Sequence, residues 1–114
     1  MKVAVIGSRN AMIANLEEYL PLNCTEIVSG GAIGIDRCAA AFAKEHGLLL
    51  TEFLPQYKQY GRAAPIVRNK QILEYADTVV AFWDGKSKGT GFSIQYCKKI
   101  GKPCTVVWIE KQPT

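Results

Sequence analysis

The sequence predicts a three-layer α/β fold of Rossmann-like type, in which helices cover both faces of a five-stranded parallel sheet in the order 3-2-1-4-5. Short apolar runs alternate with helical patterns along the whole chain of 114 residues. This alternation is typical of parallel βαβ units. Glycine-rich turns follow several of the apolar runs. A chain of this length forms one domain, which we expect over residues 1–110, with 111–114 as a loose tail.

The first half of the chain predicts three strands and two helices. The strands are Lys2–Ile6, Glu26–Ser29 and Leu48–Phe53. A helix is expected after Asn10, a residue that can cap it, because apolar residues recur at helical spacing up to Leu20 and Pro21 lies past its end. A second helix is expected over about 33–46, closed by Gly47 in the position that commonly ends helices.

The second half predicts two more helices and two more strands. In order, we expect an irregular stretch over 54–64, a helix from Pro65 to about Ala76, a strand over Thr78–Trp83, a helix from about Thr90 to Gly101, and a strand over Cys104–Ile109. Proline suits the first turn of a helix because the N–H that it lacks has no partner there. Phe92, Tyr96 and Ile100 recur at the spacing of one helix face.

The composition argues against several classes of protein. No apolar run approaches the roughly 18 residues needed to span a bilayer, and Gly7 interrupts the first run too early for a signal peptide. The four cysteines form no Cys-x-x-Cys pair, and His46 is the only histidine, so we expect buried free thiols, no metal and no cofactor. We expect a cytoplasmic protein. Its net charge of +4 slightly favours anionic ligands and permits nucleic acid without demanding it.

Three turns that follow strands are rich in glycine and hydroxyl residues. They are Gly7-Ser8-Arg9, Ser29-Gly30-Gly31-Ala32-Ile33-Gly34 and Asp84-Gly85-Lys86-Ser87-Lys88-Gly89-Thr90. Parallel strands all end at one edge of the sheet, and doubly wound sheets bind ligands at that edge, where the strand order reverses. Each turn leads into a helix N-terminus, where free N–H groups and the helix dipole favour an anion. The turns therefore predict a phosphate site.

Two better-known phosphate motifs are missing. The dinucleotide fingerprint Gly-x-Gly-x-x-Gly keeps only Gly7 after the first strand, and Ser29 stands where its acidic residue is expected. The P-loop requires a glycine five residues before its Gly-Lys-Ser, and Val80 occupies that position before Gly85. We therefore do not expect an ordinary dehydrogenase or a kinase-like ATPase.

The same residues resemble the signature of the SLOG superfamily. The resemblance is carried by Gly7-Ser8-Arg9, the run from Ser29 to Asp36, Arg68-Asn69 and Gly89-Thr90, in the right order over about residues 2–109. The run from Tyr60 to Pro65 and Trp83-Asp84-Gly85 are similar to its YspA-like branch. Relatives include DNA-processing protein A and the LOG-type phosphoribohydrolases. The resemblance implies a Rossmann-like fold that binds nucleotides or ligands derived from them, such as ADP-ribose-like signals, and some members cleave N-glycosidic bonds.

One departure argues against phosphoribohydrolase activity. Those enzymes carry a catalytic glutamate shortly after their Gly-Thr, whereas Gly91, Phe92 and Ser93 follow here. Ser87 also replaces a glycine of that motif. Phosphate binding does not depend on the missing acid.

The candidate ligand-binding residues come from these turns and from one helix. They are Gly7, Ser8, Arg9, Ser29, Gly30, Gly31, Gly34, Asp36, Arg68, Asn69, Lys88, Gly89 and Thr90. Arg68 would contact a phosphate or a ribose as a forked donor. Asp36 would either stabilise a helix N-terminus or contact a ribose hydroxyl. Asp84 fits a turn former better than a general base, but Asp84 and Asp36 are the only catalytic candidates at this edge.

Three classes of function follow from these residues. The first is binding or sensing of a phosphate-containing, nucleotide-like small molecule. The alternative is a nucleotide N-glycosidic hydrolase or transferase that uses Asp84 or Asp36. The last is single-stranded nucleic-acid binding, which the modest charge disfavours. A small domain often pairs with a second copy, so a homo-oligomer stays open.

Overall fold

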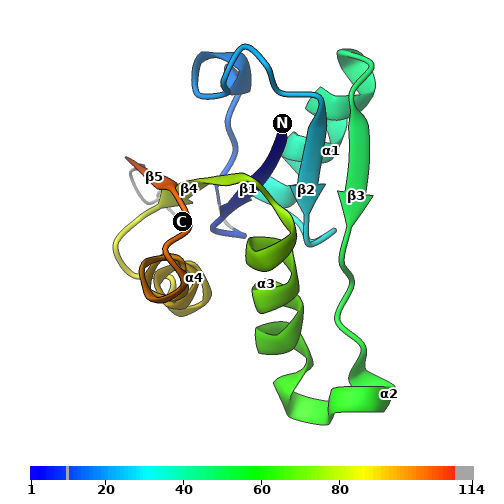
Figure 1. Ribbon diagram of the computed structural model, residues 1–114, viewed down its shortest axis with the longest axis vertical. Helices are drawn as coiled ribbons and strands as arrows, with labels where there is room; N and C mark the ends of the chain where they lie inside the picture. Colours follow the sequence, from blue (N-terminus) through cyan, green and yellow to red (C-terminus); the bar gives the residue numbers. More distant parts are fainter. Residues whose placement is uncertain (10, 110–114) are drawn as a thin grey trace.

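Five parallel strands form one sheet in the order β3-β2-β1-β4-β5 (Figure 1). In chain order the strands are β1 (Lys2–Gly7), β2 (Glu26–Ser29), β3 (Leu49–Glu52), β4 (Thr78–Trp83) and β5 (Cys104–Trp108). β1 lies at the centre, where Val3 pairs with Ile27 of β2 on one side and with Thr78 of β4 on the other. The predicted fold class and strand order are confirmed.

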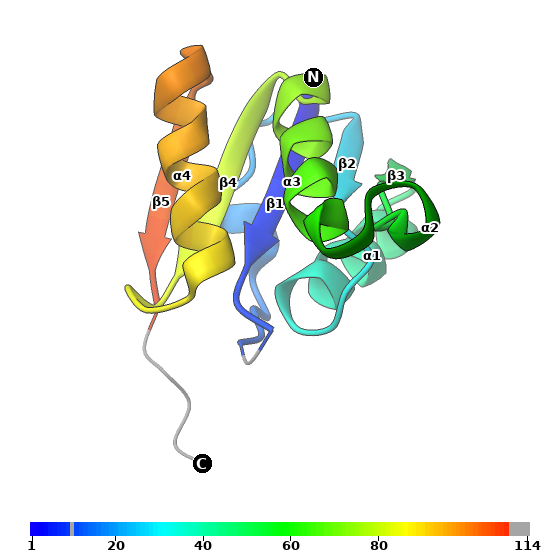
Figure 2. The same ribbon diagram turned by 90° about the horizontal axis from the view of Figure 1, so that it is seen from below.

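Three longer helices cover the two faces of the sheet. They are α1 (Ile35–Glu45), α3 (Ala64–Tyr75) and α4 (Lys88–Ile100). α3 and α4 lie on one face and α1 lies on the other (Figure 2). Alternate residues of β1 therefore enter different cores, with Val3 and Val5 on the α1 side and Ala4 and Ile6 on the side of α3 and α4. Coverage of both faces explains why β1 is apolar along its length.

The structure is a computed structural model that describes residues 1–9 and 11–109. The expected capping role of Asn10 and the expected tail over 111–114 lie outside these residues. Within the described ranges, no helix is both long and apolar enough to cross a membrane. In the same ranges, no cluster of three or more His, Cys, Asp or Glu side chains could hold a metal ion.

The α-helix predicted after residue 10 is wrong. The described part of the connection from β1 to β2 contains one short 3-10 helix, η1 (Leu16–Glu18), and no α-helix. Of the apolar residues described there, only Ala11 and Leu16 are buried, while Met12 is 76% exposed, so no continuous helix face rests on the sheet. The Asn15 side chain donates to the Glu18 carboxylate, and such local bonds compete with helix formation. The apolar residues of this segment instead pack against the α1 side of the sheet from a chain that contains no α-helix.

The other helices agree with the sequence within a few residues. α1 begins slightly later than predicted and α4 slightly earlier. Pro65 lies in the first turn of α3, as expected. The stretch over 54–64 contains two short helices, α2 (Tyr57–Tyr60) and η2 (Gly61–Ala63), rather than irregular chain throughout. Gly47 follows α1 with a φ of 67°, the left-handed conformation that glycine adopts most readily.

The prediction of buried free thiols is fully correct for Cys97 alone. All of the cysteines are free, but only Cys97 is buried. Cys24, Cys38 and Cys104 are half-buried. Cys104 lies on β5, an outer strand of the sheet, which leaves it partly accessible.

Candidate functional site

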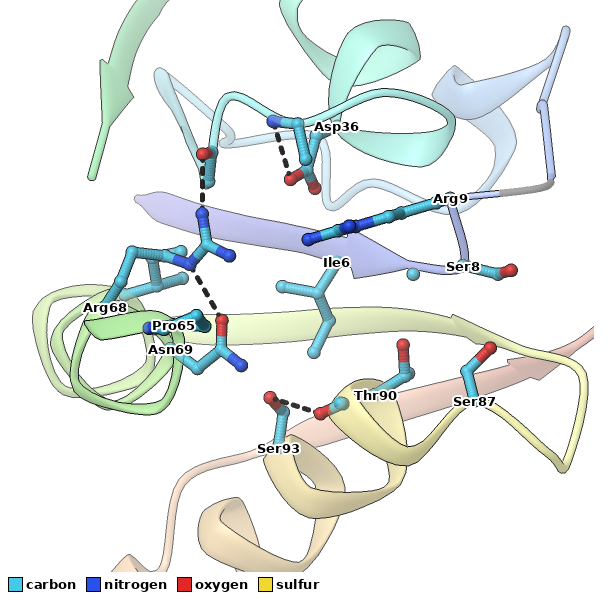
Figure 3. Close-up of a pocket in the computed structure, with 15 residues that line it drawn as sticks. Ile6, Ser8, Arg9, Asp36, Pro65, Arg68, Asn69, Ser87, Thr90 and Ser93 are labelled. Atoms are coloured by element: carbon cyan, nitrogen blue, oxygen red, sulfur yellow. Dashed lines mark hydrogen bonds between the residues drawn. The ribbon is translucent and has the colours of Figure 1, made fainter. Parts of the chain in front are cut away.

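A pocket of about 380 Å³ opens at the carboxyl edge of the sheet, next to the end of β1 (Figure 3). Four parts of the chain form its walls: the end of β1, the turn from β2 into α1, the first half of α3, and the start of α4. Its lining residues are Ile6, Gly7, Ser8, Arg9, Gly30, Ala32, Asp36, Pro65, Arg68, Asn69, Ile72, Ser87, Gly89, Thr90 and Ser93. The strand order reverses at β1, so the pocket has the position expected of a ligand site in a doubly wound sheet.

The turn after β1 is packed tightly against its neighbours. A Cβ atom on Gly7 would lie 2.8 Å from the carbonyl oxygen of Phe82 and 2.6 Å from the Ile35 side chain, so only glycine fits there. The carbonyl oxygen of Ser8 accepts a hydrogen bond of 3.3 Å from the N–H of Ile35 at the start of α1. Arg9 is exposed, and its guanidinium reaches across the pocket toward Arg68 (Figure 3).

Arg68 joins α3 to the turn after β2. Its Nη1 donates to the carbonyl oxygen of Gly30 at 2.8 Å, and its Nε donates to Oδ1 of Asn69 at 2.9 Å. A Cβ atom on Gly30 would lie 2.7 Å from this Nη1, so the glycine makes room for the arginine. The Arg68 side chain is only 8% exposed, and burial lowers its pKa from the usual value. Two hydrogen bonds thus hold a desolvated positive charge in the pocket wall.

Asp36 faces these arginines from the first turn of α1 (Figure 3). Its Oδ2 accepts a hydrogen bond of 3.1 Å from the N–H of Ala32. Burial raises the pKa of the Asp36 carboxyl, while this hydrogen bond and the positive charges of Arg68 and Arg9 act in the opposite direction. The pocket therefore combines two guanidinium groups with one carboxylate.

The start of α4 forms the opposite wall. The N–H of Gly91 makes the first helical hydrogen bond, to the carbonyl oxygen of Ser87, so the amides of residues 88–90 precede the intrahelical ladder. The Thr90 hydroxyl points into the pocket (Figure 3), and its side chain is 7% exposed. Trp83 Nε1 donates to the Ser87 carbonyl at 3.0 Å and fixes the start of the helix.

Asp84 acts as a turn former in the structure. Its Oδ1 accepts hydrogen bonds of 2.8 Å from the N–H groups of both Lys86 and Ser87. These bonds, that of Ser87 first, hold the pKa of the Asp84 carboxyl below its usual value. Asp84 does not line the pocket.

The structure brings most of the predicted ligand-binding residues together. Those that line the pocket are Gly7, Ser8, Arg9, Gly30, Asp36, Arg68, Asn69, Gly89 and Thr90. Four others do not line it: Ser29, Gly31, Gly34 and Lys88. Ser29 is fully buried and its hydroxyl oxygen accepts a hydrogen bond from the N–H of Gly31. Ser29, Gly31 and Gly34 shape the turn after β2, whereas Lys88 is the exposed first residue of α4.

Several lining residues were not among the predicted ones. Pro65 and Ile72 share a face of α3 with Arg68 and Asn69, because positions 65, 68, 69 and 72 follow helical spacing. Ser93 lies three residues after Thr90 on α4, and its hydroxyl donates to the Gly89 carbonyl at 3.1 Å. Helical spacing from the predicted residues would have found these neighbours.

No protein-family model, curated protein or solved structure matches the chain. The chemistry of the pocket follows from its own residues. Guanidinium groups donate paired hydrogen bonds that suit phosphate and carboxylate oxygens. Free amides at a helix start suit the same oxygens. The pocket offers both kinds of donor on facing walls.

Proposed function

We propose that this chain binds a phosphate-containing, nucleotide-like small molecule in the pocket at the carboxyl edge of the sheet. The observation that supports this most strongly is the placement of Arg9 and Arg68 opposite the start of α4 around one cavity. Either feature alone is common in proteins. Together they offer an anion charged donors from one side and backbone amides from the other.

The charge balance of the pocket supports an anionic ligand. Two guanidinium groups face one carboxylate, and a buried charge is costly unless a partner compensates it. Arg68 is desolvated, with hydrogen bonds to two neutral oxygens, those of Gly30 and Asn69. An arginine that is already fixed loses little side-chain entropy when it binds a phosphate, which favours binding.

The size of the pocket suits a ligand larger than phosphate. Small-molecule sites span roughly 300–1,000 Å³, and this cavity measures about 380 Å³. The resemblance to the SLOG superfamily, whose members bind nucleotide-derived ligands, supports the same ligand class, and we propose that the chain belongs to that superfamily and acts in the cytoplasm.

Ligand-dependent thermal unfolding tests the proposal. Pyrophosphate, AMP, ADP and ADP-ribose, each added over a concentration series, should raise the Tm of the protein if they bind the folded state. Arg68→Met keeps the aliphatic stem and removes the charge, so the affinity should fall about 10- to 100-fold, as expected for charge-assisted hydrogen bonds. Arg62→Met is the matched control, because Arg62 is exposed and lies outside the pocket. If no compound in this panel raises the Tm, the proposal is wrong.

One observation favours a second function, the cleavage of a nucleotide N-glycosidic bond. Asp36 places a carboxyl in the pocket, and burial raises its pKa toward the range of a proton donor. Release of free base from a nucleotide, measured by chromatography, would reveal the activity. It should disappear in Asp36→Asn and persist in Asp84→Asn, because Asp84 lies outside the pocket.

A further inference from the structure

The carboxylate of Asp36 is unexpected in a pocket whose only function is to bind a phosphate. It lies among the lining residues with Arg9 and Arg68, and its negative charge would repel an incoming anion. Oδ2 of Asp36 would lie 3.0 Å from a Cβ atom on Gly30, which puts it beside the Arg68 guanidinium. A group that weakens phosphate binding calls for another role.

The local hydrogen bond of Asp36 does not require a negative charge, although that charge favours the charged form of Arg68. The N–H of Ala32 donates to Asp36, but the amide oxygen of an asparagine would accept the same bond. The hydrogen bonds of Arg68 go to Gly30 and Asn69, so this guanidinium is held without Asp36. Among the described residues, Ala32 is the only hydrogen-bond donor to Asp36, which leaves acceptor capacity on the carboxylate.

The surroundings of the carboxylate select the kind of donor that fits there. A cationic group of the ligand is disfavoured, because the positive charges of Arg9 and Arg68 already act on the Asp36 carboxyl. A neutral donor remains. A sugar hydroxyl donates through its hydrogen and accepts through its oxygen, so it can bind Asp36 and a neighbouring guanidinium at once. An amino group of a base can only donate.

From this geometry we infer that Asp36 selects ligands that carry ribose hydroxyls, so that the ligand is a ribonucleotide or another ribose phosphate rather than a deoxyribose one. The inference rests on the proposed phosphate site and identifies the sugar as the second part of the ligand that this site recognises. Asp36 would accept hydrogen bonds from the sugar while Arg9, Arg68 and the start of α4 hold the phosphate (Figure 3).

The experiment measures, by isothermal titration calorimetry, the binding of AMP, 2′-deoxy-AMP, 3′-deoxy-AMP, GMP and inorganic pyrophosphate. The wild-type protein should bind AMP at least about 10-fold more tightly than one of the deoxy compounds, the effect of one hydrogen bond to a charged group. In Asp36→Asn this preference should shrink to about 3-fold or less. Pyrophosphate should bind Asp36→Asn more tightly than the wild type, because the repulsion is removed.

Glu52→Gln is the matched control. It removes one negative charge that also acts on Asp36, but Glu52 is exposed and outside the pocket. This variant should keep the preference for ribose. If Glu52→Gln loses the preference for ribose, the preference depends on the overall charge of the protein, and the inference is overturned.

Other outcomes separate this inference from the proposed function. If the wild type binds pyrophosphate and binds ribose and deoxyribose nucleotides equally, the inference is wrong and the phosphate site stands. If Asp36→Asn lowers the affinity for all compounds alike, Asp36 has a structural role. If the variant changes only the ratio of the affinities for AMP and GMP, Asp36 recognises the base. Both results overturn the inference. If no compound binds the wild type, the proposed function is wrong, and this inference, which depends on it, is wrong too.

Discussion

A methyl group on the Cα of Gly34 would stand 2.5 Å from the carbonyl oxygen of Arg9. Gly34 has φ of 75° and ψ of −127°, a conformation that is almost restricted to glycine. The turn from β2 into α1 therefore rests directly on the turn after β1. Gly34 does not line the pocket, but its close approach fixes two of the walls relative to each other.

Gly34→Ala should destabilise the protein strongly. Backbone strain in this region costs about 1–3 kcal/mol, and the contact with Arg9 adds to it, so we expect a loss of about 2–4 kcal/mol. Gly47→Ala is the control, because Gly47 has φ of 67° but no atom within 4 Å of an added Cβ. Strain alone should cost about 1–2 kcal/mol there. Urea denaturation measures both losses, and equal values would show that the contact between the turns is unimportant.

Gly89→Ala should separate binding from stability. Nothing lies within 4 Å of a Cβ atom on Gly89, which occupies the first turn of α4, and alanine is the better helix former by about 1 kcal/mol. Stability should stay unchanged or rise. Gly89 lines the pocket at the start of α4, so an added methyl group should crowd a ligand bound there and the affinity for pyrophosphate should fall.

Gly91→Ala is the comparison within the same helix. Its Cβ atom would lie 3.2 Å from Cζ2 of Trp83, so crowding of Trp83 should offset the gain in helix propensity and leave this variant less stable than Gly89→Ala. Thermal unfolding with and without pyrophosphate tests both variants. Full pyrophosphate affinity in Gly89→Ala would argue against a ligand at the start of α4.

Asp84→Ala should lower stability in a manner that depends on pH. The N–H groups of Ser87 and Lys86 hold the pKa of the Asp84 carboxyl below its usual value of 3.8. A carboxylate whose pKa is lowered by folding stabilises the folded state above the unfolded value, and this contribution is lost as the pH falls through the folded value. The wild type should therefore be more stable than Asp84→Ala near neutral pH, and the difference should shrink below pH 3.8. Asp84→Asn should lose less, because its side-chain oxygen still accepts hydrogen bonds. A difference that is constant from pH 2 to pH 7 would contradict this account.

The contrast between Asp84 and Asp36 shows how far the sequence could predict the site. Both acids lie in or next to glycine-containing turns that follow strands, so their local patterns are similar, and the parallel topology correctly places both turns at one edge. Their roles differ because of bonds in three dimensions. Asp84 accepts from its own loop, whereas Asp36 lies in the pocket beside Arg68, a residue from a helix much later in the chain.

Two further features could not be predicted from local sequence patterns. The hydrogen bond from Arg68 to Gly30 joins residues 38 positions apart, and no local pattern pairs them. The segment from Ala11 to Leu20 has helical spacing, but burial of Leu16 and exposure of Met12 show that tertiary contacts decide its path. The strands, in contrast, were predictable because continuous apolar runs fit few other structures.

Asp36→Asn should stabilise the unliganded protein at neutral pH, because burial raises the pKa of the Asp36 carboxyl above its usual 3.8. A group whose pKa is raised by folding favours the folded state below the unfolded value, and this contribution is lost as the pH rises through the folded value. The wild type and Asp36→Asn should therefore be equally stable below pH 3.8, and the variant should become the more stable one as Asp36 ionises. The two proteins share all their other ionisable groups, so the difference between their urea denaturation curves from pH 3 to pH 7 reports on Asp36. A variant less stable than the wild type at pH 7 would mean that attraction to Arg68 and Arg9 outweighs burial, and that the carboxylate is retained for the fold rather than for a ligand.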